Sequence, residues 1–244
     1  MFPDGFHESP LMILNHNQTN MHNLITTINF YGVNCYLMQS DTGYILIDNG
    51  FPAKRSFLDK ELEKAGCKPG NLKLVILTHG DHDHAGNSVF LRDKYGVKIA
   101  MHYDDLQMVE KEDMNWNRKV KPDKFSVMFR AMSVMSFFFK PGEFEKFTPD
   151  LFIDENFDFA YYGFEAKIIH IPGHSKGSIG ILTGDGSFVC GDFLYNIFGK
   201  PGLEFCDNLS EFKASSGKLK SLKINTFYPG HGKPFTMEQF LKKF

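Results

Sequence analysis

Short apolar runs, separated by turn residues and by stretches of helical periodicity, divide the chain into two similar parts. In the first part the pattern predicts strands at residues 24–30, 34–38, 44–47, 72–77 and 97–101 and helices at 53–65 and 85–94. In the second part it predicts strands at 167–171, 178–182, 187–189 and 224–228 and helices at 209–222 and 236–244. Residues 72–77 form an almost continuous apolar run, which is typical of a strand covered on both faces. The pattern therefore predicts an α/β protein whose two halves pack as layers.

Two segments stand outside this pattern. Residues 1–22 are polar and aperiodic, so we expect an N-terminal extension followed by a single domain over 23–244. Residues from about 111 to 150 separate the two halves and are predicted to form a helical insertion. Within it, the methionines and phenylalanines of 126–139 recur at helical spacing, which leaves three interpretations open: a helix packed on the core, a flap over an apolar substrate pocket, or a homodimer surface.

Composition and charge exclude several classes of protein. The chain has 244 residues, of which 42% are hydrophobic and 23% charged, and this is typical of a folded globular domain. With 27 Lys and Arg against 29 Asp and Glu, the net charge of -2 predicts no nucleic-acid partner and no anionic membrane surface. We expect neither a membrane span nor a secretory signal peptide. Four cysteines are too few for a disulfide framework, so reduced thiols and a cytoplasmic location are expected.

The densest cluster of chemically capable side chains follows directly on the apolar run 72–77. It contains His79, Asp81, Asp83 and His84, spaced as H-x-D-x-D-H. Imidazole nitrogens and carboxylate oxygens are the usual protein ligands of Zn, Fe and Mn. The spacing therefore predicts a metal site at the carboxyl end of this strand.

Three later loops each carry one more potential ligand after a predicted strand. His174 follows Pro172-Gly173, Asp192 follows Cys190-Gly191, and His231 follows Pro229-Gly230. Each signal alone is weak. Because sites in open α/β layers gather at the carboxyl ends of strands, we expect these side chains to meet the first cluster.

This ordered set resembles the metallo-β-lactamase-fold superfamily, and in particular its glyoxalase II-like hydrolase branch. The resemblance covers about residues 24–110 and 151–235. It implies a four-layer αββα sandwich with two divalent metal ions in a cleft. By the same resemblance, one metal is bound by His79, Asp81 and His174, and the second by Asp83, His84 and His231, with Asp192 bridging both. It further implies that Asp48 accepts a hydrogen bond from a ligand imidazole.

One position departs from the family pattern, because Asp81 stands where the family most often has histidine. A carboxylate is a harder ligand than an imidazole, so it shifts metal preference from Zn toward Fe(II) or Mn(II). The existence of the site is predicted, and the identity of its metal is left open between these ions.

The remaining polar candidates receive plainer interpretations. His82 is expected to be an exposed neighbour of the ligands, and His170 a hydrogen-bonded strand residue. His102 lies at a strand end, either lining the pocket or apart from it. Lys176 is expected to be solvated.

Taken together, the sequence predicts a dinuclear metallohydrolase that uses a metal-bound hydroxide. Asp83 is the predicted catalytic carboxylate, orienting the hydroxide while it also binds metal. The preferred substrate is a small ester, thioester or lactone with an apolar acyl part, and a phosphodiester is second. Because Asp81 suits iron, the alternative is a di-iron oxidoreductase that reduces O2 or NO with a separate electron donor.

Overall fold

The computed structural model describes residues 24–30, 32–125, 142–203 and 205–244. Its first half begins with three antiparallel strands and continues into parallel ones. These strands are β1 (Leu24–Phe30), β2 (Val33–Ser40), β3 (Gly43–Ile47), β4 (Leu72–Ile76), β5 (Lys98–Met101) and β7 (Leu151–Phe152). Between them lie the 3-10 turns Pro52–Lys54 and Tyr103–Asp105 and the helices α1 (Arg55–Lys64), α2 (His82–Ala85), α3 (Ser88–Tyr95) and α4 (Leu106–Glu110).

The second half is built in the same way. After a 3-10 turn at Phe159–Tyr162, its strands are β8 (Ala166–His170), β9 (Ile179–Thr183), β10 (Ser187–Asn196), β12 (Thr226–Gly232) and β13 (Phe235–Thr236). Its helices are α6 (Leu209–Lys220) and α7 (Met237–Lys243). The side chain of Asn208 caps α6, and Thr236 forms a capping box with Gln239 at α7.

The hydrogen-bonded order β7-β5-β4-β3-β2-β12-β10-β9-β8 is continuous, but the strand ladder between the two halves, β2 with β12, contains a single residue pair, His231 with Val33. Strand β2 shows how its two faces serve different layers. Cys35 and Leu37 pack in a cluster with α1 and α3, whereas Tyr36 and Met38 pack in a second cluster with the strands of the other half. A third cluster lies under α6 and α7.

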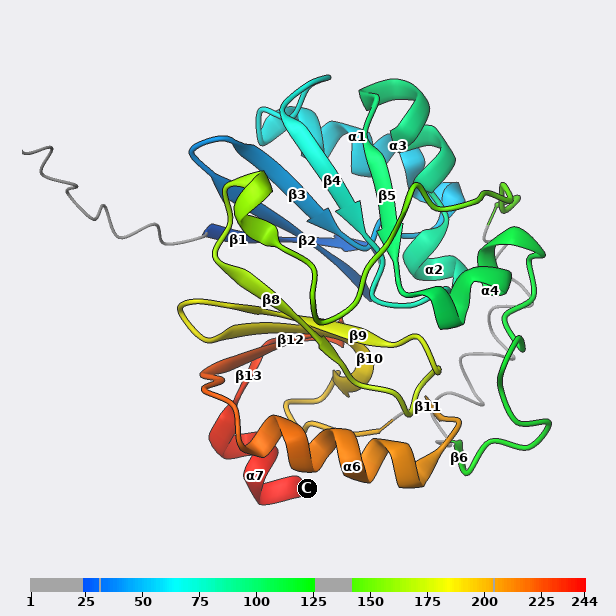
Figure 1. Ribbon diagram of the computed structural model, residues 1–244, viewed down its shortest axis with the longest axis vertical. Coiled ribbons are helices and arrows are strands. Elements are labelled where there is room, and N and C mark those ends of the chain that lie inside the picture. The colour runs from blue at the N-terminus through cyan, green and yellow to red at the C-terminus, as the bar shows by residue number, and fades with distance from the viewer. Residues whose placement is uncertain (1–23, 31, 126–141, 204) are drawn as a thin grey trace, which may run out of the picture.

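These three apolar clusters are the three interfaces of a four-layer sandwich. In Figure 1, α1 and α3 cover one side of the molecule, α6 and α7 cover the opposite side, and the strands of the two halves lie between them. The predicted αββα architecture is therefore confirmed.

The predicted helical insertion, about 111–150, differs from the structure in the two parts that the structure describes. Residues 111–125 form turns that end in β6 (Lys124–Phe125), which pairs with β11 (Phe205–Cys206), and residues 142–150 are irregular. A helix over these flanks is thus wrong, because their backbone bonds to other segments instead: residues 111–125 bond to the second half, and the N–H groups of Phe147 and Asp150 donate to the carbonyls of Val109 and Ile99 in the first half. The backbone N–H of Lys119, for example, donates to Asp207 at 2.6 Å. The stretch 126–139, with Met128, Met132 and Met135, lies outside the described residues, as does the predicted extension 1–22, so those proposals stay predictions.

Two strands run further than their sequence patterns indicate. Asp192 was expected at the end of a strand but lies inside β10, and His231 lies inside β12. Both strands carry register shifts around Gly191, whose φ is 49°. The apolar pattern stops at this irregularity although the hydrogen bonding continues beyond it, which is why the strand ends were placed too early.

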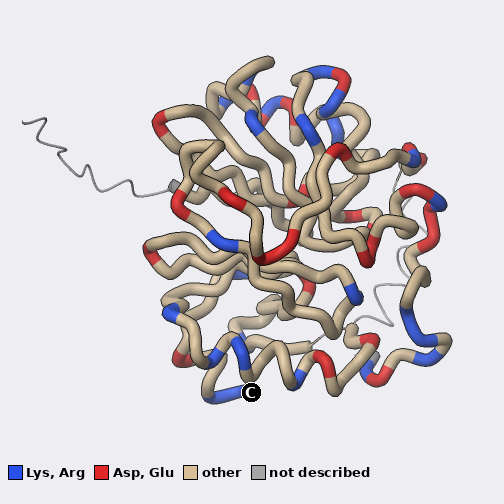
Figure 2. The backbone as a smooth tube through the Cα atoms, viewed as in Figure 1, with Lys and Arg blue, Asp and Glu red and all other residues tan. Residues whose placement is uncertain are grey.

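The surface agrees with the charge balance. On the face drawn in Figure 2, Lys and Arg alternate with Asp and Glu, so this face has no field of one sign. Within the described ranges, no helix has the length and apolar character needed to cross a membrane. All four cysteines are free and buried.

Candidate metal centre

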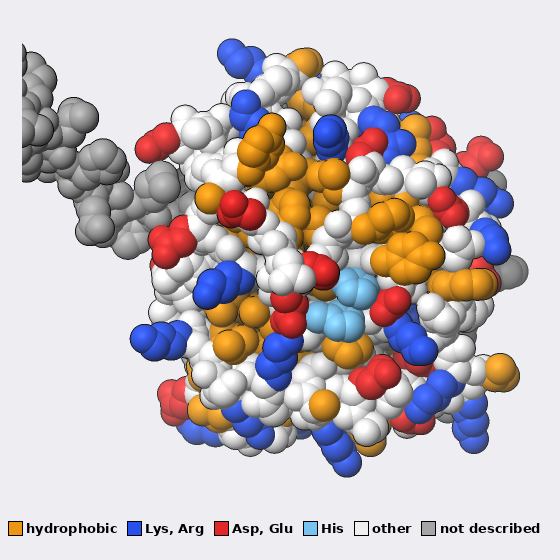
Figure 3. Space-filling view, viewed as in Figure 1, with side chains coloured by type: hydrophobic (Ala, Val, Ile, Leu, Met, Phe, Trp, Pro, Cys, Tyr) orange, Lys and Arg blue, Asp and Glu red, His pale blue; other side chains and the backbone are white. Residues whose placement is uncertain are grey.

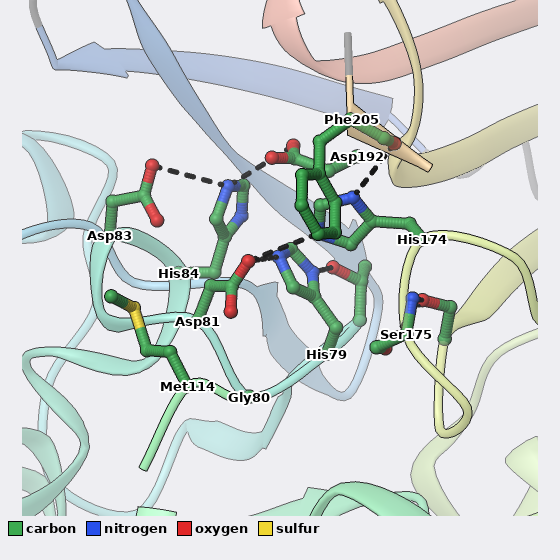
Figure 4. A network of polar contacts seen from close by, with 12 residues as sticks. His79, Gly80, Asp81, Asp83, His84, Met114, His174, Ser175, Asp192 and Phe205 are labelled. Atoms are coloured by element: carbon green, nitrogen blue, oxygen red, sulfur yellow. Dashed lines mark hydrogen bonds and ion pairs between the residues drawn. The ribbon is translucent and has the colours of Figure 1, made fainter. Parts of the chain in front are cut away.

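The first group of predicted ligands consists of His79, Asp81 and His174. The Oδ2 atom of Asp81 lies 3.4 Å from Nε2 of His79 and 3.0 Å from Nε2 of His174. His79 and His174 are almost fully buried. Figure 4 shows the three side chains directed toward one another from two loops, one that carries His79 and Asp81 and one that carries His174. The arrangement leaves two imidazole nitrogens and one carboxylate oxygen within 4.8 Å of each other, as a shared cation requires.

The orientation of His79 is fixed by hydrogen bonds behind it. The Thr78 hydroxyl donates to Oδ2 of Asp48 at 2.8 Å, so its oxygen accepts from Nδ1–H of His79 at 2.9 Å. The Nε2 lone pair of His79 is therefore free to point into the first group.

The second group consists of Asp83, His84 and His231. Oδ2 of Asp83 lies 3.8 Å from Nε2 of His84 and 3.5 Å from Nε2 of His231. Nδ1 of His84 donates to Asp48 at 2.9 Å, and Nδ1 of His231 donates to the carbonyl of Gly32 at 2.9 Å. Both rings thus turn Nε2 toward Asp83, and the expected role of Asp48 behind a ligand imidazole agrees with this geometry.

Asp192 lies between the two groups. Its Oδ1 is 3.2 Å from Nε2 of His84, and its Oδ2 is 3.1 Å from Nε2 of His231. With His79 and His84 it forms a further set of ligand atoms within 4.8 Å of one another. All seven predicted ligands therefore converge on one small volume.

Burial and neighbouring charges shift the pKa values of the ionisable groups in the site. Burial raises the pKa of Asp81, but the Arg118 guanidinium and the neighbouring imidazoles outweigh it and hold that pKa well below its usual range. Burial likewise opposes the shift at Asp192, whose pKa His231 and His84 hold well below the usual range. At His231, burial is outweighed by Asp192, which raises the pKa to about 9. For His174 burial dominates and lowers the pKa.

Residues behind the ligands tie the loops together. Asp105 is fully buried and accepts from the backbone N–H of Gly80, from the Ser175 hydroxyl and from the backbone N–H of Gly177. It therefore joins the loop of His79 to the loop of His174. The spacing analysis missed it, although its position just after β5, at the carboxyl end of a strand, was a usable signal.

The loop of His231 is held by β2. Asn34 and Tyr36 both donate to the carbonyl of Pro229, at 2.9 and 2.6 Å. Glycine is required at position 230, because a Cβ there would lie 2.1 Å from Oδ1 of Asp192.

The other candidate residues lie apart from the ligands. His82 was expected to be exposed, but it is half-buried, because its ring stacks on Phe144 with centroids 4.2 Å apart. His102 and His170 stack on each other at 4.4 Å, and Nε2 of His170 donates to the carbonyl of Lys176 at 2.8 Å. Lys176 itself is exposed, as expected.

The largest omission of the sequence analysis is Arg118. Its Nη1 and Nη2 donate to Oδ1 and Oδ2 of Asp81 at 2.8 and 3.0 Å, and Nη2 lies 3.1 Å from Nε2 of His174. The guanidinium also lies over the ring of Phe205 at 5.0 Å. A single arginine in a polar segment carries no spacing signal, so nothing in the sequence alone pointed to this position.

The donor set fits divalent metal ions. Nε2 of His79, Nε2 of His84 and Oδ1 of Asp192 are buried and have no hydrogen-bond partner among the residues that the structure describes. Buried polar atoms without partners are costly, and a metal ion that takes their lone pairs removes that cost. Imidazole and carboxylate donors suit Zn, Fe and Mn.

Comparisons with known proteins agree with this geometry. A sequence profile of the Metallo-beta-lactamase superfamily matches residues 28–231. The Hydroxyacylglutathione hydrolase GloC of Haemophilus influenzae is 28% identical, over 88% of this chain and 92% of that protein. The Beta-lactamase-like protein 2 homolog of Drosophila melanogaster is 25% identical over 82% of this chain, which spans 59% of that longer protein. The solved structure of BLEG-1, a B3 metallo-beta-lactamase, has a TM-score of 0.64 at 20% identity, over 90% of this chain and 97% of that one.

Proposed function

This chain belongs to the metallo-beta-lactamase superfamily and is a metallohydrolase, and from that premise we propose that it hydrolyses a small ester, thioester or lactone with an apolar acyl part. The proposal has two parts: the bond that is cleaved is a carboxylic ester, thioester or lactone, and the acyl group is apolar.

One observation carries the proposal: buried ligand atoms without protein partners converge from both halves of the fold. In the assignment we propose, His79, Asp81 and His174 hold one metal ion, Asp83, His84 and His231 hold a second, and Asp192 contacts both. Zinc, iron and manganese all suit this set. When bound, such ions lower the pKa of water and polarise the oxygen of an electrophile.

The side chains around the ions have separate tasks in this proposal. Asp83 has the most exposed carboxylate of the three in the site, at 24% against 13% for Asp81 and 12% for Asp192. It is therefore the carboxylate best able to orient an incoming water and to accept its proton. Asp48 and Thr78 keep the imidazoles in the tautomer that leaves Nε2 free.

Two observations support the choice of substrate. Met114, Trp116 and Val120, on either side of Arg118 in the sequence, are exposed apolar side chains. The carbonyl of Met114 accepts from Arg118, which places this segment at the edge of the first ligand group (Figure 4). The second support is the similarity to a protein named as a hydroxyacylglutathione hydrolase, whose name denotes a thioester substrate.

The test is a substrate panel on one sample of metal-loaded protein. The panel contains acyl thioesters and aryl esters of two to eight carbons, a set of lactones, and an aryl phosphodiester. We expect carboxylic substrates to be hydrolysed faster than the phosphodiester, with KM falling as the acyl chain lengthens. Preferential cleavage of the phosphodiester would contradict the proposed class of bond. A KM that does not depend on chain length would contradict the preference for an apolar acyl group.

A second candidate function rests on Asp81. A carboxylate at this position favours iron, so the alternative is a di-iron centre that reduces O2 or NO with electrons from a separate donor. Iron-loaded protein mixed with a chemical reductant would then consume O2 or NO catalytically. Consumption no faster than that of free iron at equal concentration would rule this alternative out.

A further inference from the structure

Arg118 brings a fixed positive charge into the first ligand group. Its side chain is only 8% exposed, and its two Nη atoms form a forked pair with both oxygens of Asp81. Nη1 also donates to the carbonyl of Met114 at 2.8 Å, and the guanidinium lies over Phe205. An arginine held by a forked ion pair, a carbonyl and an aromatic face is a fixed part of the site rather than a surface charge that swings through solvent.

The same guanidinium competes with a metal ion for one ligand atom. Nη2 lies 3.1 Å from Nε2 of His174, and Nδ1 of that ring faces the carbonyl of Phe205 at 3.4 Å. Nδ1 therefore carries the ring proton, and Nε2 has a single lone pair, which the guanidinium takes. A metal ion bound to His174 must displace Nη2 from this atom. Asp81 is different, because a carboxylate has lone pairs for both partners.

The second ligand group has a different environment. Its rings donate to Asp48 and to the carbonyl of Gly32, and their Nε2 atoms face Asp83 and Asp192. No Lys or Arg of the described part of the chain forms an ion pair or hydrogen bond with these ligands. Among the residues that the structure describes, a cation entering the second group therefore meets no guanidinium or ammonium group, whereas one entering the first group meets Arg118.

We propose that Arg118 is a resident cation of the first ligand group and makes it the weaker of two unequal metal sites. The inference rests on the proposed metal assignment. The second group fills first, and the first group fills only at higher metal concentration, after Arg118 leaves His174. Below that concentration the guanidinium supplies the positive charge that neutralises Asp81.

The experiment is a metal titration of the intact protein with Zn²⁺ and Mn²⁺, followed by calorimetry and by competition with a chromophoric chelator. Wild-type protein is expected to bind one equivalent tightly and a second at least about tenfold more weakly. Arg118→Gln removes the charge and is expected to strengthen the second equivalent by about tenfold or more while leaving the first unchanged. Arg118→Lys keeps a charge but loses the fork, so its effect is expected to lie between these two.

Further variants show which ligand group binds each metal equivalent, and one of them controls for the loss of a nearby positive charge. In wild-type protein, His174→Ala should abolish only the weak equivalent, and His231→Ala should abolish the tight one. Lys119→Gln removes a neighbouring positive charge whose side chain is 43% exposed and pairs with Asp123, and it should leave both affinities unchanged.

The outcomes separate this inference from the proposed function. Two equally tight equivalents in wild-type protein, or unequal ones that Arg118→Gln does not change, overturn the role of Arg118 and leave the metallohydrolase intact. Should Arg118→Gln fail to fold, the wild-type titration and the Arg118→Lys variant still test whether Arg118 weakens metal binding at the first group. Absence of bound metal in every protein, with hydrolysis nevertheless present, overturns the metal assignment itself and this inference with it.

Discussion

The two ligand groups contain the same donors, two imidazoles and one carboxylate each, yet they differ in what surrounds them. In the second group, both rings are held from behind by acceptors at 2.9 Å. In the first, His174 has only a 3.4 Å contact to the carbonyl of Phe205, and Arg118 occupies its other nitrogen. The comparison teaches that ligand identity defines a site, whereas the groups behind and beside the ligands decide how strongly it binds.

The largest expected effect is a difference in kcat between variants of two carboxylates, Asp83 and Asp81. Asp83→Asn removes the carboxylate assigned to orient water, so kcat is expected to fall by about 10²- to 10⁴-fold with the fold intact. Asp81→Asn should cost less, because it weakens only the first group. Steady-state kinetics and circular dichroism measure both variants, with Asp93→Asn, an exposed carboxylate outside the site, as a matched control. Near-normal kcat in Asp83→Asn would show that the assigned mechanism is wrong.

The next effect tests the hydrogen bonds that Asp48 and Thr78 form with the imidazole rings of His84 and His79. Asp48 accepts from the backbone N–H and the hydroxyl of Thr78 and from His84, and an amide at this position cannot accept all three bonds. Asp48→Asn is therefore expected to weaken metal binding at the second group by about 10- to 100-fold. Thr78→Val should weaken mainly the first group, because His79 donates to that hydroxyl. Equal losses at both sites in both variants would contradict this division.

The stability of the metal-free protein should depend on pH through the second group. In the folded chain Asp192 raises the pKa of His231 from the ordinary 6.5 to about 9, so the folded state binds this proton more tightly than the unfolded state. The resulting stabilisation is fully present below about pH 6.5 and is lost as pH rises through about 9, a loss of about 1–3 kcal/mol. Urea unfolding at pH 6.5 and pH 10 measures it. The decrease should become small in Asp192→Asn, and an unchanged decrease would exclude Asp192 as its cause.

The smallest expected effect concerns the choice of metal. Asp81→His replaces a hard carboxylate by a softer imidazole, so the ratio of Zn to Fe bound after loading with both should rise several-fold. The change should arise in the weaker equivalent, since Asp81 belongs to the first group. Elemental analysis of protein loaded with both ions gives the ratio. If the ratio stays unchanged, Asp81 does not bind metal.

Much of the fold and of the site was predictable from local sequence. The apolar run before His79 marked a buried strand, and the four ligands within six residues marked a site at its end, because both signals are contained in a short window. The predicted ligands His174, Asp192 and His231 were identified from their Gly-containing loops. The strands of Asp192 and His231 were placed too short, since the register shifts at Gly191 interrupt the apolar pattern but not the hydrogen bonding.

What the sequence did not predict depends on contacts between distant segments. Arg118 reaches Asp81 across 37 positions, and Asp105 reaches Ser175 across 70. Arg118 has no neighbour in sequence that marks it as part of a site, and Asp105 is marked only by its place after the end of a strand. The flanks of the insertion were expected to be helical, but β6 gains its partner only when β11 folds beside it. Hydrophobic side chains also reach the surface in several patches between charged ones (Figure 3), and composition alone does not say where such patches lie.

The most direct test of the central claim is a titration of metal-free protein with Zn, Fe(II) or Mn(II), with acyl thioester hydrolysis and bound metal measured on the same samples. We predict no turnover without metal, activity that appears as the first equivalent binds, and saturation at two ions per chain. Full turnover by the metal-free protein, or fewer than about 0.2 ions bound per chain after reconstitution with each metal, would contradict the account.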